Sequence, residues 1–287
     1  MPEKIKLIDS LSEVDELTVG EERRIHSATH DEIIAGATSD IYFIKTQEIL
    51  RRMNKGDCVV TAEIFARKPG VFVGIEEVLG LLQDAPVDVW AQPEGSEIVP
   101  KQVLCRIKGR YADFGVYETA ILGMLASASG WATAAREIKA ACPDKPVGCF
   151  GARHIHPSVA PVMERAAVLG GCDSCSCVLG AKLLGQYPAG TTPDAVFLTV
   201  GDTVEAALAY DKYMPEGAAR TILIDTFKDE IEEALRVAEA MGDKLAGVRL
   251  DTPAERGGVT AGLISELRQR LDMAGYQHVK IFATGGL

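Results

Sequence analysis

An arginine and an aspartate stand two residues apart in the segment Val-Arg-Leu-Asp-Thr at residues 248–252. Alternate residues of a strand project from the same side, so Arg249 and Asp251 are expected to lie together. A guanidinium beside a carboxylate suits a substrate that carries an anionic ring group and a ribose. A structural ion pair is the alternative, and the segment alone leaves both interpretations open.

A second carboxylate ends the apolar run at residues 221–225. Asp225, followed by Thr226, can stabilise positive charge or bind ribose hydroxyls. Asp225 is also suited to cap a helix that begins near Lys228. Gly285 and Gly286 follow a third run, and glycines let backbone N–H groups approach a phosphate closely, although any turn can contain them.

Two further segments place cations near turns. Arg67 and Lys68 precede a Pro-Gly turn and can hold a pyrophosphate, with a solvated basic loop as the alternative. Arg153, His154 and His156 follow the apolar run at residues 147–150. Two histidines need a third ligand to bind a metal ion, so an anion or ring site is the preferred interpretation.

The spacing of Cys172, Cys175 and Cys177 resembles that of a CxxCxC metal-binding motif. A structural zinc ion usually takes four ligands, and no second Cys or Cys/His pair occurs at the usual spacing. We therefore expect no metal site here, and we interpret the cysteines as small residues packed inside a core. The odd total of seven cysteines favours reduced thiols.

The elements that must position these residues change in character along the chain. Helical patterns at residues 22–52 and 116–141 enclose strand-like stretches at 58–66, 87–91 and 102–109, which predicts an α+β N-terminal domain over residues 1–145. Polar side chains before Ile41 can cap a helix there. After Pro146, short apolar runs alternate with helical patterns; the runs are 147–150, 195–200, 221–225, 245–250 and 279–283, with a further candidate near 173–178.

Such alternation predicts βαβ units and a parallel sheet, hence an α/β fold. Polar residues at the strand ends favour an irregular (β/α) barrel over residues 146–287, with an open doubly wound sheet as the competitor. About six strands precede Leu287, whereas a closed barrel has eight. We expect a barrel that is incomplete because the chain is cut off, or an edge that a partner covers.

The composition restricts the classes of function. A net charge of −11 disfavours nucleic-acid binding through phosphates. No stretch approaches the roughly 20 apolar residues of a membrane span, and the N-terminus has no apolar signal core. We expect a cytoplasmic protein with no nucleic-acid or membrane partner.

Seven segments, in order along nearly the whole chain, together resemble nicotinate phosphoribosyltransferase in its short archaeal and bacterial form. They are HDEIIAGATSDIYF (30–43), AEIFARKPGVFVG (62–74), YETAILGML (117–125), FGARHIHPSVAPVMERAAVLGGCDSCS (150–176), IDTFKDE (224–230), VRLDTPAERGG (248–258) and IFATGG (281–286). The related quinolinate- and nicotinamide-using transferases share the architecture of an α/β N-terminal domain packed on an incomplete or irregular barrel.

The resemblance implies roles for single residues. Asp40 and Tyr42 match a segment whose tyrosine stacks near the pyridine ring, usually from the neighbouring subunit, so at least a homodimer is implied. Arg67 matches the arginine that grips pyrophosphate. Phe150 and Arg153 match the pair that sandwiches the ring and faces its carboxylate.

The remaining matches concern catalysis and the phosphoribosyl group. They are Asp173 near the ring, Asp225 and Thr226 at the ribose, Arg249 and Asp251 at the ring acid and the ribose hydroxyls, and Gly285 and Gly286 at the 5′-phosphate. Of these, the three aspartates are the expected catalytic residues.

The chemistry that the resemblance implies belongs to NAD biosynthesis. The ring nitrogen of nicotinate attacks the anomeric carbon of phosphoribosyl pyrophosphate, and pyrophosphate leaves. Carboxylates would stabilise an oxocarbenium-like transition state, while Arg67 and Mg²⁺ take the leaving charge.

One segment departs from the family pattern. Members that couple the reaction to ATP carry a phosphorylated histidine in Gly-Thr-x-Pro-His, whereas residues 190–194 here read Gly-Thr-Thr-Pro-Asp. Asp194 lacks the imidazole nucleophile, so the use of ATP is left open. Two other functions also stay open: a quinolinate phosphoribosyltransferase that decarboxylates its substrate, and a degenerate, non-catalytic homologue that binds nucleotide.

Overall fold

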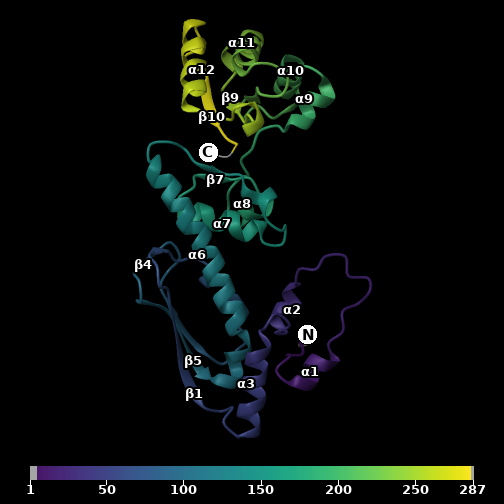
Figure 1. The fold of residues 1–287 in the computed structure, drawn as a ribbon, viewed down its shortest axis with the longest axis vertical. Coiled ribbons are helices and arrows are strands. Elements are labelled where there is room, and N and C mark those ends of the chain that lie inside the picture. Colours follow the sequence, from purple (N-terminus) through teal and green to yellow (C-terminus); the bar gives the residue numbers. More distant parts are fainter. Residues whose placement is uncertain (1–4, 286–287) are drawn as a thin grey trace. The chain divides into compact units, whose positions relative to one another are not determined.

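The structure, a computed structural model, describes residues 5–285 and is of mixed α/β type (Figure 1). It divides into two compact units, Met1–Ala189 and Gly190–Leu287, and each unit has a hydrophobic core of its own. This division by compactness does not test the domain boundary expected after residue 145, which stays a prediction.

Unit 1 begins with three helices, each capped by a side chain. They are α1 (Leu11–Glu16), α2 (His30–Ile34) and α3 (Ile41–Arg52). The predicted cap before Ile41 is confirmed, because the Asp40 carboxylate accepts a hydrogen bond from the Tyr42 N–H. The helical pattern expected at residues 22–52 is only partly formed. Residues 22–29 are not helical, and Gly36, with φ of 81°, lies in the turn that separates α2 from α3.

An antiparallel sheet follows, with strand order β1-β5-β3. Its strands are β1 (Val59–Phe65), β3 (Asp88–Ala91) and β5 (Val103–Arg110), close to the three stretches expected from the sequence. The short strands β2 (Gly70–Val71) and β4 (Glu97–Ile98) pair with each other, and helix α4 (Ile75–Leu81) lies between them in sequence. Burial of Leu104, Ile107, Val78 and Ile121 joins β5 to α4 and to the next long helix in one core.

The long helix of unit 1 is α6 (Glu118–Ala141), which follows α5 (Tyr111–Phe114) and the 3-10 turn η1 (Gly115–Tyr117). It confirms the helix expected at residues 116–141, and it runs from the sheet to helix α7 (Ala160–Gly170) (Figure 1). Ala128, Ala132 and Ala135 form a buried stripe of small side chains on α6. This stripe lets α7 approach so closely that a Cβ atom on Gly170 would lie 2.1 Å from the Ala132 carbonyl oxygen.

Unit 1 ends in a small parallel βαβ arrangement. Strands β6 (Gly148–Cys149) and β7 (Ser174–Cys175) pair in parallel, with α7 between them in sequence. The 3-10 turn η2 (Gly151–His154) follows β6, and helix α8 (Val178–Leu183) follows β7.

Unit 2 contains a parallel sheet of order β10-β9-β8, formed by β8 (Thr221–Leu223), β9 (Gly247–Leu250) and β10 (Lys280–Ala283). The helices are α9 (Asp194–Val200), α10 (Thr203–Tyr213), α11 (Glu230–Met241) and α12 (Ala261–Met273), with short 3-10 turns η3 (Gly242–Lys244) and η4 (Ala254–Arg256). Figure 1 shows α10, α11 and α12 grouped around β9 and β10. Ile222, Val248 and Leu250 are buried beneath them.

One predicted strand of this region was wrong. Residues 195–200 lie in helix α9, which begins directly after Pro193 and buries Phe197. A short apolar run is equally compatible with a buried strand and with a helix, so periodicity could not separate the two. The described residues after Pro146 therefore hold five strands, in two parallel sheets that belong to different units. The barrel arrangement stays a prediction.

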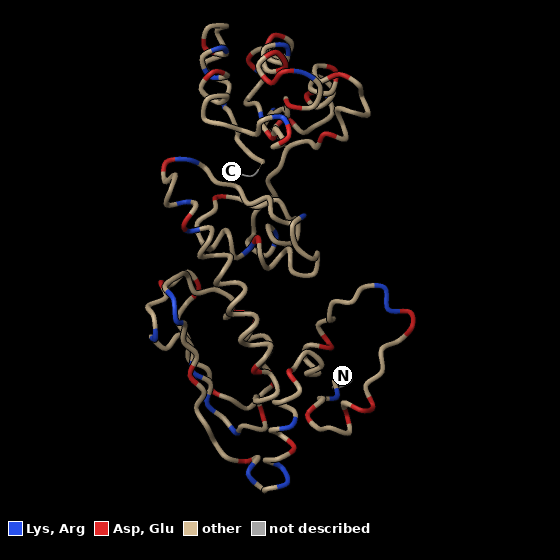
Figure 2. Tube along the Cα trace, in the orientation of Figure 1, with Lys and Arg blue, Asp and Glu red and all other residues tan. Residues whose placement is uncertain are grey.

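Charge of both signs is interspersed along the backbone of each unit, as Figure 2 shows. Within residues 5–285, no helix has both the length and the apolar character needed to cross a membrane.

The close contact of α7 with α6 generates a stability prediction. Gly170→Ala should lower the free energy of unfolding by about 1–3 kcal/mol, because the new methyl group collides with backbone of α6. Gly130→Ala, at an exposed position of α6 with open space around it, is the matched control and should stabilise by about 0.5–1 kcal/mol. Urea unfolding of both variants measures the difference, and equal stability of the two would refute the close packing.

Candidate functional site

Arg249 is the centre of a hydrogen-bond network at the carboxyl ends of β8, β9 and β10. Its Nε donates to the Thr284 hydroxyl at 3.0 Å, and its Nη1 donates to the Thr191 hydroxyl at 2.9 Å. Its Nη2 donates to the Asp251 carboxylate, so the predicted pair is formed. Only 11% of the Arg249 side chain is exposed. The guanidinium is thereby fixed in orientation by groups from three separate segments.

Thr284 ties the third strand into this network. Its hydroxyl, besides accepting from Arg249, donates to the Leu250 carbonyl oxygen at 2.8 Å. Gly285 comes next, with φ of 87°, and a Cβ atom there would lie 2.8 Å from an Asp251 carboxylate oxygen. A glycine is therefore needed for backbone to pass so close to Asp251. Gly286, the second expected phosphate-binding glycine, lies outside the described residues.

Asp225 ends the neighbouring strand and is only 6% exposed. Its Oδ1 atom is buried and has no hydrogen-bond partner among residues 5–285. Burial, reinforced by the nearby negative charges of Asp194 and Asp251, raises the pKa of Asp225 to about 6, and Arg249 opposes the rise. The predicted alternative, a helix cap, belongs to another residue: Asp229 caps α11 and accepts from the N–H groups of Ile231 and Glu232.

The segment before α9 and the first residue of that helix contact the same strand ends through two hydrogen bonds. Thr191 accepts from Arg249, and the Asp194 carboxylate accepts from the Thr226 hydroxyl at 3.0 Å. Sequence reasoning connected residues 190–194 only with ATP. Nothing in the spacing could link Thr191 to an arginine 58 positions later.

A second layer of polar contacts holds the loops that follow β8 and β9. The Thr252 hydroxyl donates to Glu230 Oε1 at 2.8 Å, and both residues are buried. Arg256 Nη1 donates to the Asp225 carbonyl oxygen at 2.6 Å. The backbone of Asp225 is therefore fixed, although its Oδ1 atom has no hydrogen-bond partner among residues 5–285.

The remaining predicted residues belong to unit 1. Phe150 is half-buried and directly precedes η2, and Arg153 is exposed within that turn, so both follow the carboxyl end of β6. Tyr42 is 53% exposed and its ring lies 4.0 Å from that of Phe43. Asp40 caps α3, and Arg67 is exposed just after β1.

Asp173 is placed differently from Phe150 and Arg153. Its carboxylate accepts from the Val147 N–H at 2.8 Å and from Lys139 Nζ at 2.9 Å, and these bonds lower its pKa. Val147 and Asp173 each precede a strand, so this cluster lies at the amino ends of β6 and β7, opposite the edge from which Phe150 continues. Its contacts are those of a structural residue, and its catalytic role stays a prediction.

Sequence reasoning missed one carboxylate in unit 1. Glu164, on α7, has no exposed surface and accepts hydrogen bonds from the Ala152 N–H, the Ser176 hydroxyl and the Cys177 N–H. An acidic residue among the buried alanines of a helix was the available signal.

The three cysteines of the CxxCxC stretch do not form a cluster of metal ligands. Cys172 packs against Ala135 and Ala167, and burial raises its pKa to about 11. Cys175 is also buried, whereas Cys177 precedes α8. Among the described residues, no three His, Cys, Asp or Glu side chains are placed to hold a metal ion together.

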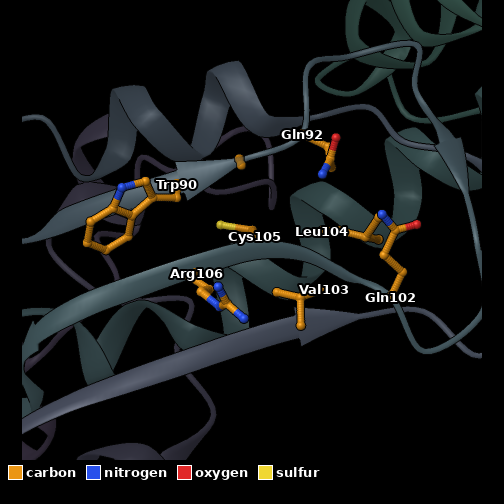
Figure 3. Close-up of a pocket in the computed structure, with 8 residues that line it drawn as sticks. Trp90, Gln92, Gln102, Val103, Leu104, Cys105 and Arg106 are labelled. Carbon is orange, nitrogen blue, oxygen red and sulfur yellow. The ribbon is translucent and has the colours of Figure 1, made fainter.

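A surface hollow of about 400 Å³ lies on β3 and β5 and is lined by Trp90, Gln92, Gln102 and Arg106 among others (Figure 3). None of the residues selected from the sequence lines this hollow. Arg106 is already paired with Glu63 at 2.7 Å. The strand ends of unit 2, with their carboxylates and glycine turn, are the better candidate for chemistry.

Two family models cover most of the chain. The N-terminal domain of quinolinate phosphoribosyl transferase matches residues 40–129, and the C-terminal domain of the same family matches residues 131–287. The nicotinate phosphoribosyltransferase pncB2 of Mycobacterium tuberculosis is 30% identical over 205 residues, which are 70% of this chain and 42% of that protein. The chain thus spans less than half the length of this relative.

Solved structures show the same likeness. The nicotinate-nucleotide pyrophosphorylase of Pyrococcus furiosus is 48% identical, with a TM-score of 0.89 over 92% of this chain and 69% of that one. Human nicotinic acid phosphoribosyltransferase is 20% identical, with a TM-score of 0.73 over 87% of this chain and 68% of that one, and shares the fold.

The buried Asp225 carboxyl generates a prediction about pH. An acid whose pKa rises from 3.8 to about 6 on folding destabilises the protein once it ionises. Below pH about 4 it is protonated in both states, and above pH about 6 the full penalty, up to about 3 kcal/mol, is present. The stability of Asp225→Asn relative to the wild type should therefore rise between pH 4 and pH 6 and stay level beyond.

Chemical denaturation across this pH range measures the effect. Asp243→Asn, which removes one negative charge from an exposed position of the same unit, is the control. A constant difference between Asp225→Asn and the wild type at every pH would show that Asp225 is not perturbed by burial.

Proposed function

The chain belongs to the quinolinate phosphoribosyl transferase family, and from this premise we propose that it transfers phosphoribose from phosphoribosyl pyrophosphate to nicotinate. The products are nicotinate mononucleotide and pyrophosphate, in the biosynthesis of NAD. The observation that carries the proposal is the fixed Arg249–Asp251 pair beside the buried Asp225 at one edge of a parallel sheet.

Arg249 is the proposed partner of the ring carboxylate. A guanidinium presents N–H donors in a rigid fork that suits a carboxylate, and the bonds to Thr284 and Thr191 fix the plane of that fork. Because the Arg249 guanidinium is already oriented, less conformational entropy would be lost when nicotinate binds.

Asp225 and Asp251 are the proposed stabilisers of the transition state. As pyrophosphate leaves, positive charge develops on the ribose. A buried carboxylate with one oxygen, Asp225 Oδ1, that has no hydrogen-bond partner among residues 5–285 is well suited to stabilise this charge. At neutral pH the ionised Asp225 is unfavourable in the folded protein because burial raises its pKa to about 6. The attraction to a transient cation offsets this penalty only during the reaction.

The phosphates of the substrate need donors and a counter-charge. The turn at Gly285 brings backbone close to Asp251 and is the proposed start of the 5′-phosphate site. Mg²⁺ usually binds to one or two carboxylates together with substrate phosphates, and Asp225 and Asp251 provide oxygen ligands of the right kind. The ion would bind together with phosphoribosyl pyrophosphate and would neutralise part of the negative charge on the departing pyrophosphate. Arg67 is the proposed second positive charge for this group.

The family resemblance supplies the proposed roles in unit 1. Phe150 and Arg153, which follow β6, would contact the pyridine ring and its acid group. Asp40 and the exposed Tyr42 would contribute to the site of a neighbouring copy, which makes a homodimer the smallest active assembly.

A second candidate is transfer to quinolinate with loss of carbon dioxide. The family description favours it, and Arg153, His154 and His156 supply some of the additional Arg, Lys or His side chains that a second carboxylate would require. Nicotinate remains the first choice because the curated relatives carry that name and the Asp-x-Tyr and VRLDTPAERGG segments match it.

One assay of the full chain tests the proposal and the use of ATP together. With phosphoribosyl pyrophosphate, Mg²⁺ and nicotinate, we expect nicotinate mononucleotide to form without ATP or with weak stimulation. An aspartate cannot form the phosphoramidate of a phosphohistidine, and Asp194 is already bound to Thr226. Product and ADP are measured by chromatography, with quinolinate and ATP varied independently.

Each outcome of this assay has a distinct meaning. Hydrolysis of one ATP per turnover contradicts the ATP-independent mechanism. Release of carbon dioxide from quinolinate at a higher kcat/KM than transfer to nicotinate makes the second candidate correct. Absence of product from either acid favours a non-catalytic homologue.

A further inference from the structure

We propose that Glu164 is a positioning residue that fixes the two loops presenting Phe150 and Arg153 to the pyridine substrate. The inference rests on the proposed function, since it deepens the account of how the ring is held. Glu164 was not among the residues selected from the sequence, and its carboxylate accepts hydrogen bonds from Ala152, Ser176 and Cys177.

The buried carboxylate joins the loops that follow two different strands. Its Oε1 atom accepts from the Ala152 N–H at 3.0 Å, within the turn η2 after β6, and from the Ser176 hydroxyl at 2.8 Å, after β7. Its Oε2 atom accepts from the Cys177 N–H. One side chain thereby connects the carboxyl ends of both strands of this sheet.

The adjacent residue of α7 supports η2 by packing. A Cβ atom on Gly151 would lie 2.5 Å from the Met163 Cε atom, so the methionine fills the space that the glycine leaves. Met163 and Glu164 together therefore contact the first two residues of η2, Gly151 and Ala152. Phe150 and Arg153 flank these two residues in sequence.

A simple packing role would not require a carboxylate at this position. The same helix buries Ala160, Ala166 and Ala167, and an apolar side chain would avoid the cost of burying a charge. Glu164 takes part in none of the ion pairs found in residues 5–285, and three polar donors converge on it instead. Glutamine has the same shape but a single acceptor oxygen, and its NH₂ group would face a donor.

The test compares Glu164→Gln with Glu137→Gln, the same chemical change at an exposed position of α6. Amide hydrogen exchange, read by mass spectrometry, should become faster in peptides that contain Ala152 and Cys177 and stay unchanged elsewhere. In steady-state assays the KM for nicotinate should rise at least about tenfold, whereas the KM for phosphoribosyl pyrophosphate should change less than about twofold. The reason is that the buried donors that lose their acceptor lie only in the two loops proposed to hold the ring.

Ser176→Ala gives a second, milder probe, since it removes one donor and keeps the carboxylate. It should shift the same KM in the same direction by a smaller factor, and it carries the test if Glu164→Gln does not fold. Equal changes in both KM values, or unchanged exchange in both loops, would overturn the positioning role. If the wild type transfers no phosphoribose, the proposed function fails, and the exchange experiment alone decides the role of Glu164.

Discussion

The guanidinium of Arg249 is the group on which the candidate site of unit 2 depends. It is bonded to Asp251 on its own strand end, to Thr284 after β10, and to Thr191 in the segment before α9. These segments are far apart in sequence and meet because parallel strands bring their carboxyl ends to one edge of a sheet. The apolar core beneath β8, β9 and β10 holds the three strands together, and Arg249 joins the segments that follow them by hydrogen bonds.

A cation fixed in this way allows acidic groups to gather nearby. Asp194, Asp225 and Asp251 interact at the same edge, where burial, together with the negative charges of Asp194 and Asp251, raises the pKa of Asp225. Hydrogen bonds outside this cluster, such as that from Thr252 to Glu230, hold the loops that carry the carboxylates. The loops therefore do not depend on bonds between the carboxylates themselves. Under the proposed function, these carboxylates provide the negative charge that would stabilise a ribose as it becomes positive.

Much of this arrangement could be predicted from the sequence. The pairing of Arg249 with Asp251 follows from the two-residue period of a strand, and the positions of β8, β9 and β10 follow from three apolar runs. Residues 195–200 were misassigned because a short apolar run has no diagnostic period. Glu164, Thr191 and the amino-end location of Asp173 depend on contacts between distant segments, which composition and spacing do not encode.

Removal of the Arg249 side chain tests the central claim most directly. In Arg249→Ala, the KM for nicotinate should rise about ten- to a hundredfold, because a charge-assisted hydrogen bond worth about 1.5–3 kcal/mol is lost. Arg270→Ala, at an exposed position of α12, should leave nicotinate kinetics as they are in the wild type. Unchanged nicotinate kinetics in Arg249→Ala would remove Arg249 from the substrate site and contradict the account.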